Sequence, residues 1–272
     1  MRKTPSRRLP AVAGQFYPGS REALAYELKE YTERGLRKQK AIAAVCPHAG
    51  YMYSGAVAGA VYSAIEVPQT VVLLGPNHSG FGPQFSIMSE GEWELPNGLV
   101  PINSALAELI IKEAPGFIRN STAQVLEHSL EVQVPFITYF RPDADIVPIV
   151  MLQAGLDELK EAGLGLARAI RAYGKDVLIV ASSDMSHYVP DEEARRKDRM
   201  AIEKILALDA GGLFSTVIRE RITMCGYIPA TVMLFAAKAL GAKEAALVKY
   251  ATSGEVSGDF SQVVGYAGIA VR

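Results

Sequence analysis

The chain has 272 residues, and 49% of them are hydrophobic, enough to fill a sizeable core. Its 28 Lys and Arg against 29 Asp and Glu give a formal net charge of -1, which argues against bulk electrostatic binding to nucleic acid or anionic lipid. No apolar run reaches the ~18 residues of a membrane span, and the N-terminus lacks an apolar signal-peptide core. We therefore expect a cytoplasmic protein that has no membrane or nucleic-acid partner.

Short apolar runs alternate with helical patterns along the chain, which is typical of an α/β fold with a largely parallel sheet. The predicted strands are 41–46, 70–75, 145–151, 176–182, 245–252 and 263–271. The predicted helices are 21–35, 54–65, 103–114, 128–140, 156–174, 191–208 and 229–241.

Two further features complete the expected architecture. The segment 84–98 is predicted to form a hairpin after the second strand, and the strand 263–271 alternates so little that it should lie inside the sheet. No linker rich in glycine, serine or proline divides the chain. We expect a single domain, residues 1–272, with a central parallel or mixed sheet flanked by helices.

Three of the four histidines lie just past the C-terminal ends of separate predicted strands. His48 follows the first strand, His78 the second and His187 the fourth. Ligands bind at this edge of open α/β sheets, so the three rings should meet in space. One such histidine is more often a hydrogen-bonded structural residue. Three at equivalent positions predict a metal site, because neutral imidazole is a common ligand for zinc, iron and copper.

The two cysteines do not form a disulfide framework, and they differ in their expected roles. Cys225 lies at the predicted start of a helix, where the helix dipole and free N–H groups lower a thiol's pKa and favour the metal-binding thiolate. It is the natural third ligand, with a small buried residue as the alternative. Cys46 lies within a strand and is expected to pack in the core.

The stretch SSDMSHY places an acid three residues before a histidine. Asp184 can orient the ring of His187 or exchange protons beside it. Ser182 and Ser183 are expected to cap turn amides. A Ser-His-Asp hydrolase is disfavoured, because the sequence has no G-x-S-x-G elbow and these residues are too close along the chain.

The stretch EHSLEVQVPF begins with an acid and the fourth histidine. Glu127 and His128 are placed at a predicted helix start, where they can line the site. The alternative is purely structural, with Glu131 supporting the capping of this helix.

Seven motifs together give the chain a resemblance to the archaeal and bacterial members of the Memo family (mediator of ErbB2-driven cell motility). They are AVAGQFYPG, PHAGYMYSG, LLGPNHSG, EHSLEVQVPF, SSDMSHY, CGYIPA and ATSGEVSGD, in the family's order over essentially the whole chain. The resemblance implies a fold similar to the class III extradiol (LigB-like) dioxygenases, which use non-haem iron.

The same resemblance implies that His48, His78 and Cys225 are metal-ligand positions and that Asp184 and His187 line the pocket, with His187 as the acid-base histidine. The related dioxygenases use two histidines and a glutamate. A cysteine in place of the carboxylate makes the site softer and favours copper(I), zinc or thiolate-bound iron. Relatives are described as signalling adaptors in animals, and in prokaryotes they are linked to AMMECR1-like and radical SAM proteins.

Three functional hypotheses follow. The first is a metal-binding protein, with iron or copper and zinc as a further option, that carries out redox or oxygen chemistry on an unknown small molecule. The second is a non-catalytic module that binds a peptide or protein through the retained pocket, shaped by Tyr51, Tyr53 and Tyr188. The third is a metal-dependent hydrolase.

A homodimer is the default expectation. The residues expected to line the pocket are Glu127, His128, Ser183 and Tyr53.

Overall fold

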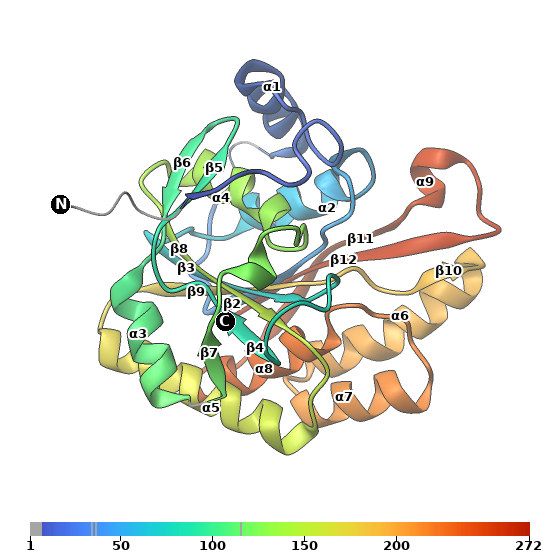
Figure 1. The fold of residues 1–272 in the computed structure, drawn as a ribbon. Coiled ribbons are helices and arrows are strands. Elements are labelled where there is room, and N and C mark those ends of the chain that lie inside the picture. Colours follow the sequence, from blue (N-terminus) through green and yellow to red (C-terminus); the bar gives the residue numbers. More distant parts are fainter. Residues whose placement is uncertain (1–6, 34, 36, 115) are drawn as a thin grey trace.

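The computed structural model describes residues 7–33, 35, 37–114 and 116–272 (Figure 1). Its strands are β1 Arg7–Arg8, β2 Ala43–Cys46, β3 Thr70–Pro76, β4 Phe85–Ile87, β5 Glu92–Leu95, β6 Gly98–Pro101, β7 Phe117–Arg119, β8 Asp145–Met151, β9 Val177–Ser182, β10 His187–Val189, β11 Ala245–Thr252 and β12 Val263–Val271. Its helices are α1 Arg21–Tyr31, α2 Tyr51–Ala64, α3 Ser104–Glu113, α4 Val134–Phe140, α5 Leu156–Tyr173, α6 Asp191–Leu206, α7 Ala210–Arg219, α8 Tyr227–Leu240 and α9 Gly254–Ser257, with short 3-10 turns at Thr122–Gln124 and Glu131–Gln133.

The main sheet is mixed, as predicted. Within the described residues it has nine strands in the order β10-β12-β2-β9-β3-β8-β4-β7, with β11 pairing with β12. The central strands β2, β9, β3 and β8 are parallel, so their C-terminal ends point to one edge. Strand β12 runs antiparallel between β11 and β2, which confirms that it lies inside the sheet. All six predicted strands form.

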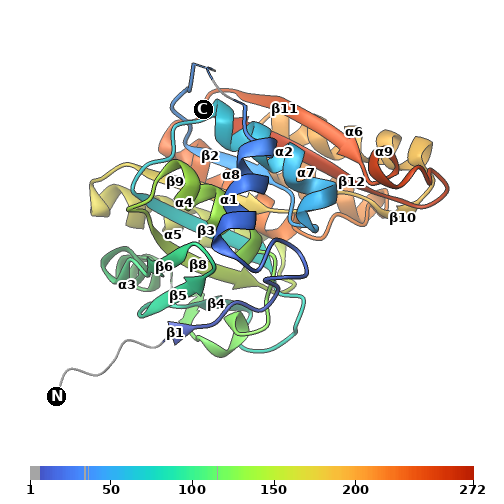
Figure 2. The same ribbon diagram turned by 90° about the horizontal axis from the view of Figure 1, so that it is seen from above.

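Helices cover both faces of this sheet and bury a hydrophobic core on each. One core lies against α3, α5, α6, α7 and α8, and the other against α1, α2 and α4 (Figure 1). Figure 2 looks onto the face that α1 and α2 cover. Every residue of β3 is buried, which explains why its sequence is a continuous apolar run rather than an alternating one. The α/β fold class is therefore confirmed.

Several local features differ from the predictions, among them the helix expected over 128–140, which begins only at Val134. The segment 84–98 is not one hairpin, because Phe85–Ile87 joins the main sheet beside β8, and the hairpin is formed by β5 and β6. These two strands form a small separate sheet with β1. Helix α7 was not predicted, since Gly211 and Gly212 lower its intrinsic helix propensity. Asp209 compensates, because its side chain accepts the N–H of Gly212 at the helix start.

A buried ion pair ties the small sheet to the segment before α4. Arg8 is only 5% exposed, and its guanidinium pairs with Glu131 at 2.5 Å. The same group donates to the carbonyl oxygens of Gln124 and Glu127, each at 2.7 Å, and lies over the ring of Trp93 at 4.2 Å. These contacts satisfy a charge that would otherwise be costly to bury.

Glu131 therefore does not cap a helix, and that expectation was wrong. Its carboxylate accepts the N–H groups of Ala11 and Val12 at 2.7 and 3.0 Å and the hydroxyl of Tyr17 at 2.6 Å. The partners of this acid lie more than a hundred positions earlier in the chain. Glu131 thus anchors the N-terminal residues against the segment that precedes α4.

In the described part of the chain, no helix is both long enough and apolar enough to cross a bilayer.

Replacing Arg8 with alanine should lower the free energy of unfolding by about 3–5 kcal/mol, because Glu131 would stay buried without its charge partner. Urea unfolding at neutral pH, followed by circular dichroism, measures this loss. Arg7→Ala is the matched control, since Arg7 pairs with Glu92 and Glu94 at the surface and should leave the midpoint nearly unchanged. Equal midpoints for the two variants would contradict the importance of the buried pair.

Candidate metal centre

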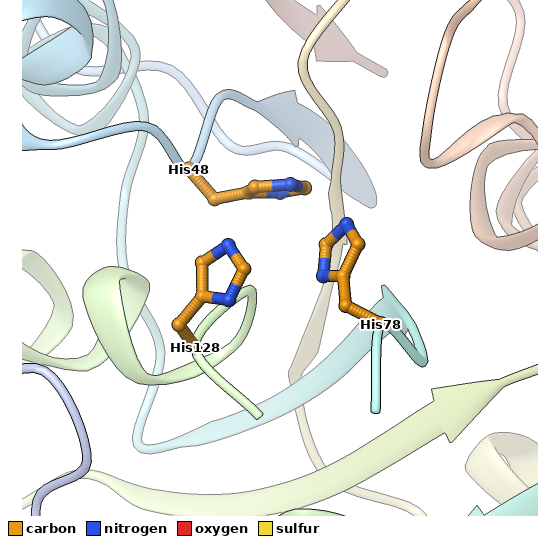
Figure 3. A group of neighbouring side chains, drawn as sticks. All are labelled: His48, His78 and His128. Atoms are coloured by element: carbon orange, nitrogen blue, oxygen red, sulfur yellow. The ribbon is translucent and has the colours of Figure 1, made fainter. Parts of the chain in front are cut away.

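Three histidines meet at the C-terminal edge of the parallel strands. His48 and His78 lie two residues beyond β2 and β3, and His128 lies in the loop before the Glu131–Gln133 turn. One ligand nitrogen from each ring lies within 4.8 Å of the others. Figure 3 shows the three rings turned toward one another from separate segments of the chain. The sequence correctly placed His48 and His78 together, but the third ring it predicted was His187, which is not in this group, and it treated His128 only as a residue lining the pocket.

A directional chain of hydrogen bonds fixes the tautomer of His48. Its Nδ1 lies 3.0 Å from the Ser182 hydroxyl oxygen, which also contacts the Ser129 carbonyl at 2.6 Å and the Gln133 amide nitrogen at 2.8 Å. The carbonyl can only accept and the amide can only donate, so the single hydroxyl hydrogen goes to Ser129. His48 must then donate from Nδ1, which leaves the Nε2 lone pair free. The expectation that Ser182 caps turn amides was wrong, because its hydroxyl orients the ring of His48.

A buried carboxylate fixes the second ring in the same way. Glu127 accepts from Nδ1 of His78 at 2.9 Å and from the His78 N–H at 2.6 Å, and it also accepts the Ser129 N–H at 2.9 Å. Burial by itself raises the Glu127 pKa, but these hydrogen bonds lower it to about 2. Glu127 is therefore ionised at neutral pH, and it leaves Nε2 of His78 free, as in a carboxylate–histidine–metal arrangement.

The cluster is electrostatically suited to neutral imidazole. Burial lowers the pKa of His48 well below its usual value, and the neighbouring rings of His128 and His78 lower it further. Burial also lowers the pKa of His128, whose ring stacks on His78 at a centroid distance of 4.7 Å. Neutral imidazole is the form that binds metal ions.

Cys225 lies beside the cluster, two residues before α8. Its sulfur is 3.3 Å from Nε2 of His48, so these residues, 177 positions apart, do converge. Among the described residues, Cys225 is not in the group whose ligand atoms all lie within 4.8 Å. Desolvation and the nearby Asp184 carboxylate raise the pKa of this half-buried thiol, and this outweighs the lowering expected from the helix start. Cys46 is buried in β2 and packs in the core, as expected.

Asp184 and His187 lie next to the histidine cluster. The buried Asp184 carboxylate accepts the His48 N–H at 2.7 Å, and burial raises its pKa. Nδ1 of His187 contacts the carbonyl oxygens of Met185 and Thr223 at 2.8 and 2.9 Å. Because both partners only accept, Nδ1 carries a hydrogen and the Nε2 lone pair of this half-buried ring is free.

The remaining two predicted residues have different surroundings. Ser183 is buried, accepts the Gly226 N–H at 3.0 Å and donates to the Asp184 carbonyl at 2.7 Å, so it ties the segment of Cys225 to the end of β9. Tyr53 is half-buried near the start of α2 and lines a cavity of about 440 Å³ with Phe16 and Met52. Ser183 thus directly follows Ser182, which contacts His48, whereas the cavity beside Tyr53 is lined by none of the three histidines.

Comparisons with known proteins match nearly the whole chain. The family model described as Memo-like protein matches residues 8–270. MEMO1 family proteins of Pyrobaculum arsenaticum, Aquifex aeolicus and Methanothermobacter thermautotrophicus are 43%, 44% and 42% identical, each over 96% of this chain and 98% of the relative. The crystal structure of the uncharacterized protein JW3007 from Escherichia coli K12 has a similar fold, with a TM-score of 0.56 at 15% identity over 84% of this chain and 98% of that chain.

The lowered pKa of Glu127 predicts an acid-dependent stability in protein freed of metal by a chelator. A depressed carboxyl pKa stabilises the fold above the unfolded value of 4.5, and this contribution is lost as the pH falls from 4.5 to about 2. Its size is about 3 kcal/mol. Urea unfolding across this range should show a shallower acid loss for Glu127→Gln than for wild type. Glu108→Gln, at an exposed ion pair, should follow wild type, and identical acid profiles for the two variants would refute the assignment.

Proposed function

Because the chain belongs to the Memo-like protein family, we propose that it binds one transition-metal ion through His48, His78 and His128 and supports redox or oxygen chemistry on a small molecule. One observation carries this proposal. Three imidazoles from separate segments converge, and two of them have Nδ1 committed as a donor to a buried acceptor.

The donor set fits a resident metal ion. Imidazole suits iron, copper and zinc, and the low pKa values of His48 and His128 keep these rings neutral. Glu127 and Ser182 hold two of the rings in a set orientation, which is how outer partners support metal ligands. When bound, such an ion supplies Lewis-acid or one-electron redox chemistry. We place iron or copper before zinc because the proposed chemistry is redox.

His128 is our choice for the third ligand, in place of Cys225. Among the described residues, the three histidines form the group whose ligand atoms all lie within 4.8 Å of one another, and the Cys225 sulfur is outside it. Desolvation raises the pKa of the Cys225 thiol, which must lose its proton before it can bind metal. The thiol hydrogen can go to the Asp184 carbonyl oxygen, 3.6 Å from the sulfur, so Nε2 of His48 stays available and Cys225 would lie beside the ligand set. The family resemblance implies the alternative set of His48, His78 and Cys225. With that set, metal should be lost in Cys225→Ala and kept in His128→Ala.

Two residues beside the cluster can handle protons. The free Nε2 of His187 can accept a proton from a bound substrate, since Nδ1 is already held by two carbonyl oxygens. Burial raises the pKa of the Asp184 carboxyl, which accepts the His48 N–H, and this makes it a better proton acceptor than an exposed aspartate. These roles are the same whether the reaction is an oxidation or a hydrolysis.

A second candidate is a module that binds a peptide without turnover. Four exposed large apolar side chains each lie within four positions of one of the four histidines along the chain. They are Met52, Phe81, Leu126 and Tyr188. Apolar side chains that gather around one site favour an interaction surface, whereas scattered ones need no explanation.

Metal analysis of protein purified without a histidine tag tests the leading proposal. Wild type should hold about one ion of iron, copper or zinc per chain, as a single site with three protein ligands requires. His48→Ala combined with His78→Ala should lose it, and His128→Ala alone should raise the dissociation constant at least about tenfold. Cys225→Ala and His187→Ala should retain the ion.

Two outcomes would change these conclusions. Equal metal content in wild type and the double variant would remove the metal-site proposal altogether. Metal lost with Cys225→Ala and kept with His128→Ala would restore the ligand set of His48, His78 and Cys225.

Peptide selection on phage, against wild type and Tyr188→Ala, tests the second candidate. A binding module should enrich one sequence motif on wild type and lose it on the variant, because Tyr188 is a large exposed side chain next to His187 in the chain. Tyr26→Ala is the control, since Tyr26 has a similar exposure on α1 and should leave the enrichment intact. Failure to enrich any motif on wild type would argue against the module.

A further inference from the structure

His128 differs from the other two rings of the cluster in how it is held. Across the described ranges, no hydrogen bond holds either of its ring nitrogens, and its nearest acid contact is Glu127, at 3.7 Å from Nδ1. Packing takes the place of hydrogen bonding. The ring lies between His78, stacked at 4.7 Å, and Phe16, tilted at 4.9 Å between centroids.

We propose that residues 7–19, here called the N-terminal strap, are a positioning element of the metal centre that sets the place of His128. This inference rests on the proposed function, since it assigns the strap a role at that same site. It also accounts for the motif AVAGQFYPG, which supplies no residue to the cluster itself.

Arg8 carries the first link, through the backbone. Its guanidinium donates to the carbonyl oxygens of Gln124 and Glu127, both at 2.7 Å. Glu127 directly precedes His128, so the peptide group that leads into the histidine is bound by a buried, charged donor. Arg8 is in turn paired with Glu131, three residues past His128. The strap thus clamps the segment of His128 from both sides.

Phe16 carries the second link, through the side chain. Glu131 fixes the path of the strap at Ala11, Val12 and Tyr17, on either side of Phe16. The Phe16 carbonyl accepts the Tyr51 N–H at 2.7 Å, three residues beyond His48. The ring of Phe16 is therefore held in place on both flanks when it packs against His128.

The consequence is a specific loss when the aromatic ring is removed. Without Phe16, His128 could rotate about its side-chain bonds, and metal binding would have to restrict that freedom. We expect Phe16→Ala to weaken metal binding about tenfold, the lower end of what outer-shell changes cost. Phe16→Tyr retains the ring and should bind like wild type.

Cobalt(II) titration followed by visible absorption measures these affinities, using wild type, Phe16→Ala, Phe16→Tyr, His128→Ala and the double variant of Phe16→Ala with His128→Ala. Phe16→Ala should have no further effect when His128 is already absent. Phe260→Ala is the control, because Phe260 is an exposed aromatic residue outside the strap. An equal loss with and without His128 would show general destabilisation and overturn the inference, as would unchanged affinity in Phe16→Ala.

A readout that needs no metal separates this inference from the proposed function. In the apo protein, a nuclear Overhauser effect should connect the rings of His48 and His128, whose centroids are 5.6 Å apart. It should weaken in Phe16→Ala and persist in Phe16→Tyr. If wild type binds no cobalt and this effect still weakens, the proposed function fails while the positioning role stands. If the effect is unchanged in Phe16→Ala, the positioning role fails.

Discussion

Two buried acceptors decide what the histidine cluster can do. The Ser182 oxygen and the Glu127 carboxylate each take the Nδ1 hydrogen of one ring, and so leave Nε2 of His48 and His78 without a hydrogen. Imidazole can present either nitrogen, and only the outer partner selects between them. Ser182 does this because Gln133 and Ser129 have already set the direction of its own hydroxyl. The chemistry of the site therefore depends on residues that need never touch a ligand.

The same outer partners connect the site to the rest of the fold. Ser182 is the last residue of β9, a central strand, so the orientation of His48 is fixed relative to the middle of the sheet. Glu127 lies in the segment that Arg8 holds through its carbonyl oxygen. The buried pair of Arg8 and Glu131 is thus part of the support for the metal centre as well as for the small sheet. Burying both charges is tolerable because the guanidinium and the carboxylate have several hydrogen-bond partners each.

The comparisons and the geometry bear on different questions. The relatives cover nearly the whole chain at more than 40% identity, which establishes the family. The E. coli structure, at 15% identity, shows only that the fold is shared. Neither names a reaction. The case for metal binding comes from the convergent imidazoles of His48, His78 and His128, which could hold a metal ion.

Local sequence patterns were enough to predict much of the fold of this protein. Central strands such as β2 and β3 were predictable because residues buried on both faces form apolar runs, and His48 and His78 because each directly follows such a run. Parallel strands end at one edge, so their convergence followed from the fold class. The helices with clear periodicity, such as α5, were predictable on the same local grounds.

Only the tertiary structure decided the parts that depend on distant partners. Glu131 pairs with residues from the N-terminus instead of capping its own helix, and β4 leaves the expected hairpin because β8 offers a partner. His128 joins His48 and His78, and the half-buried Cys225 comes to lie 3.3 Å from His48, through neighbours that no short stretch of sequence contains. Burial and hydrogen-bond direction set these roles, and both are properties of the folded surroundings rather than of the residue.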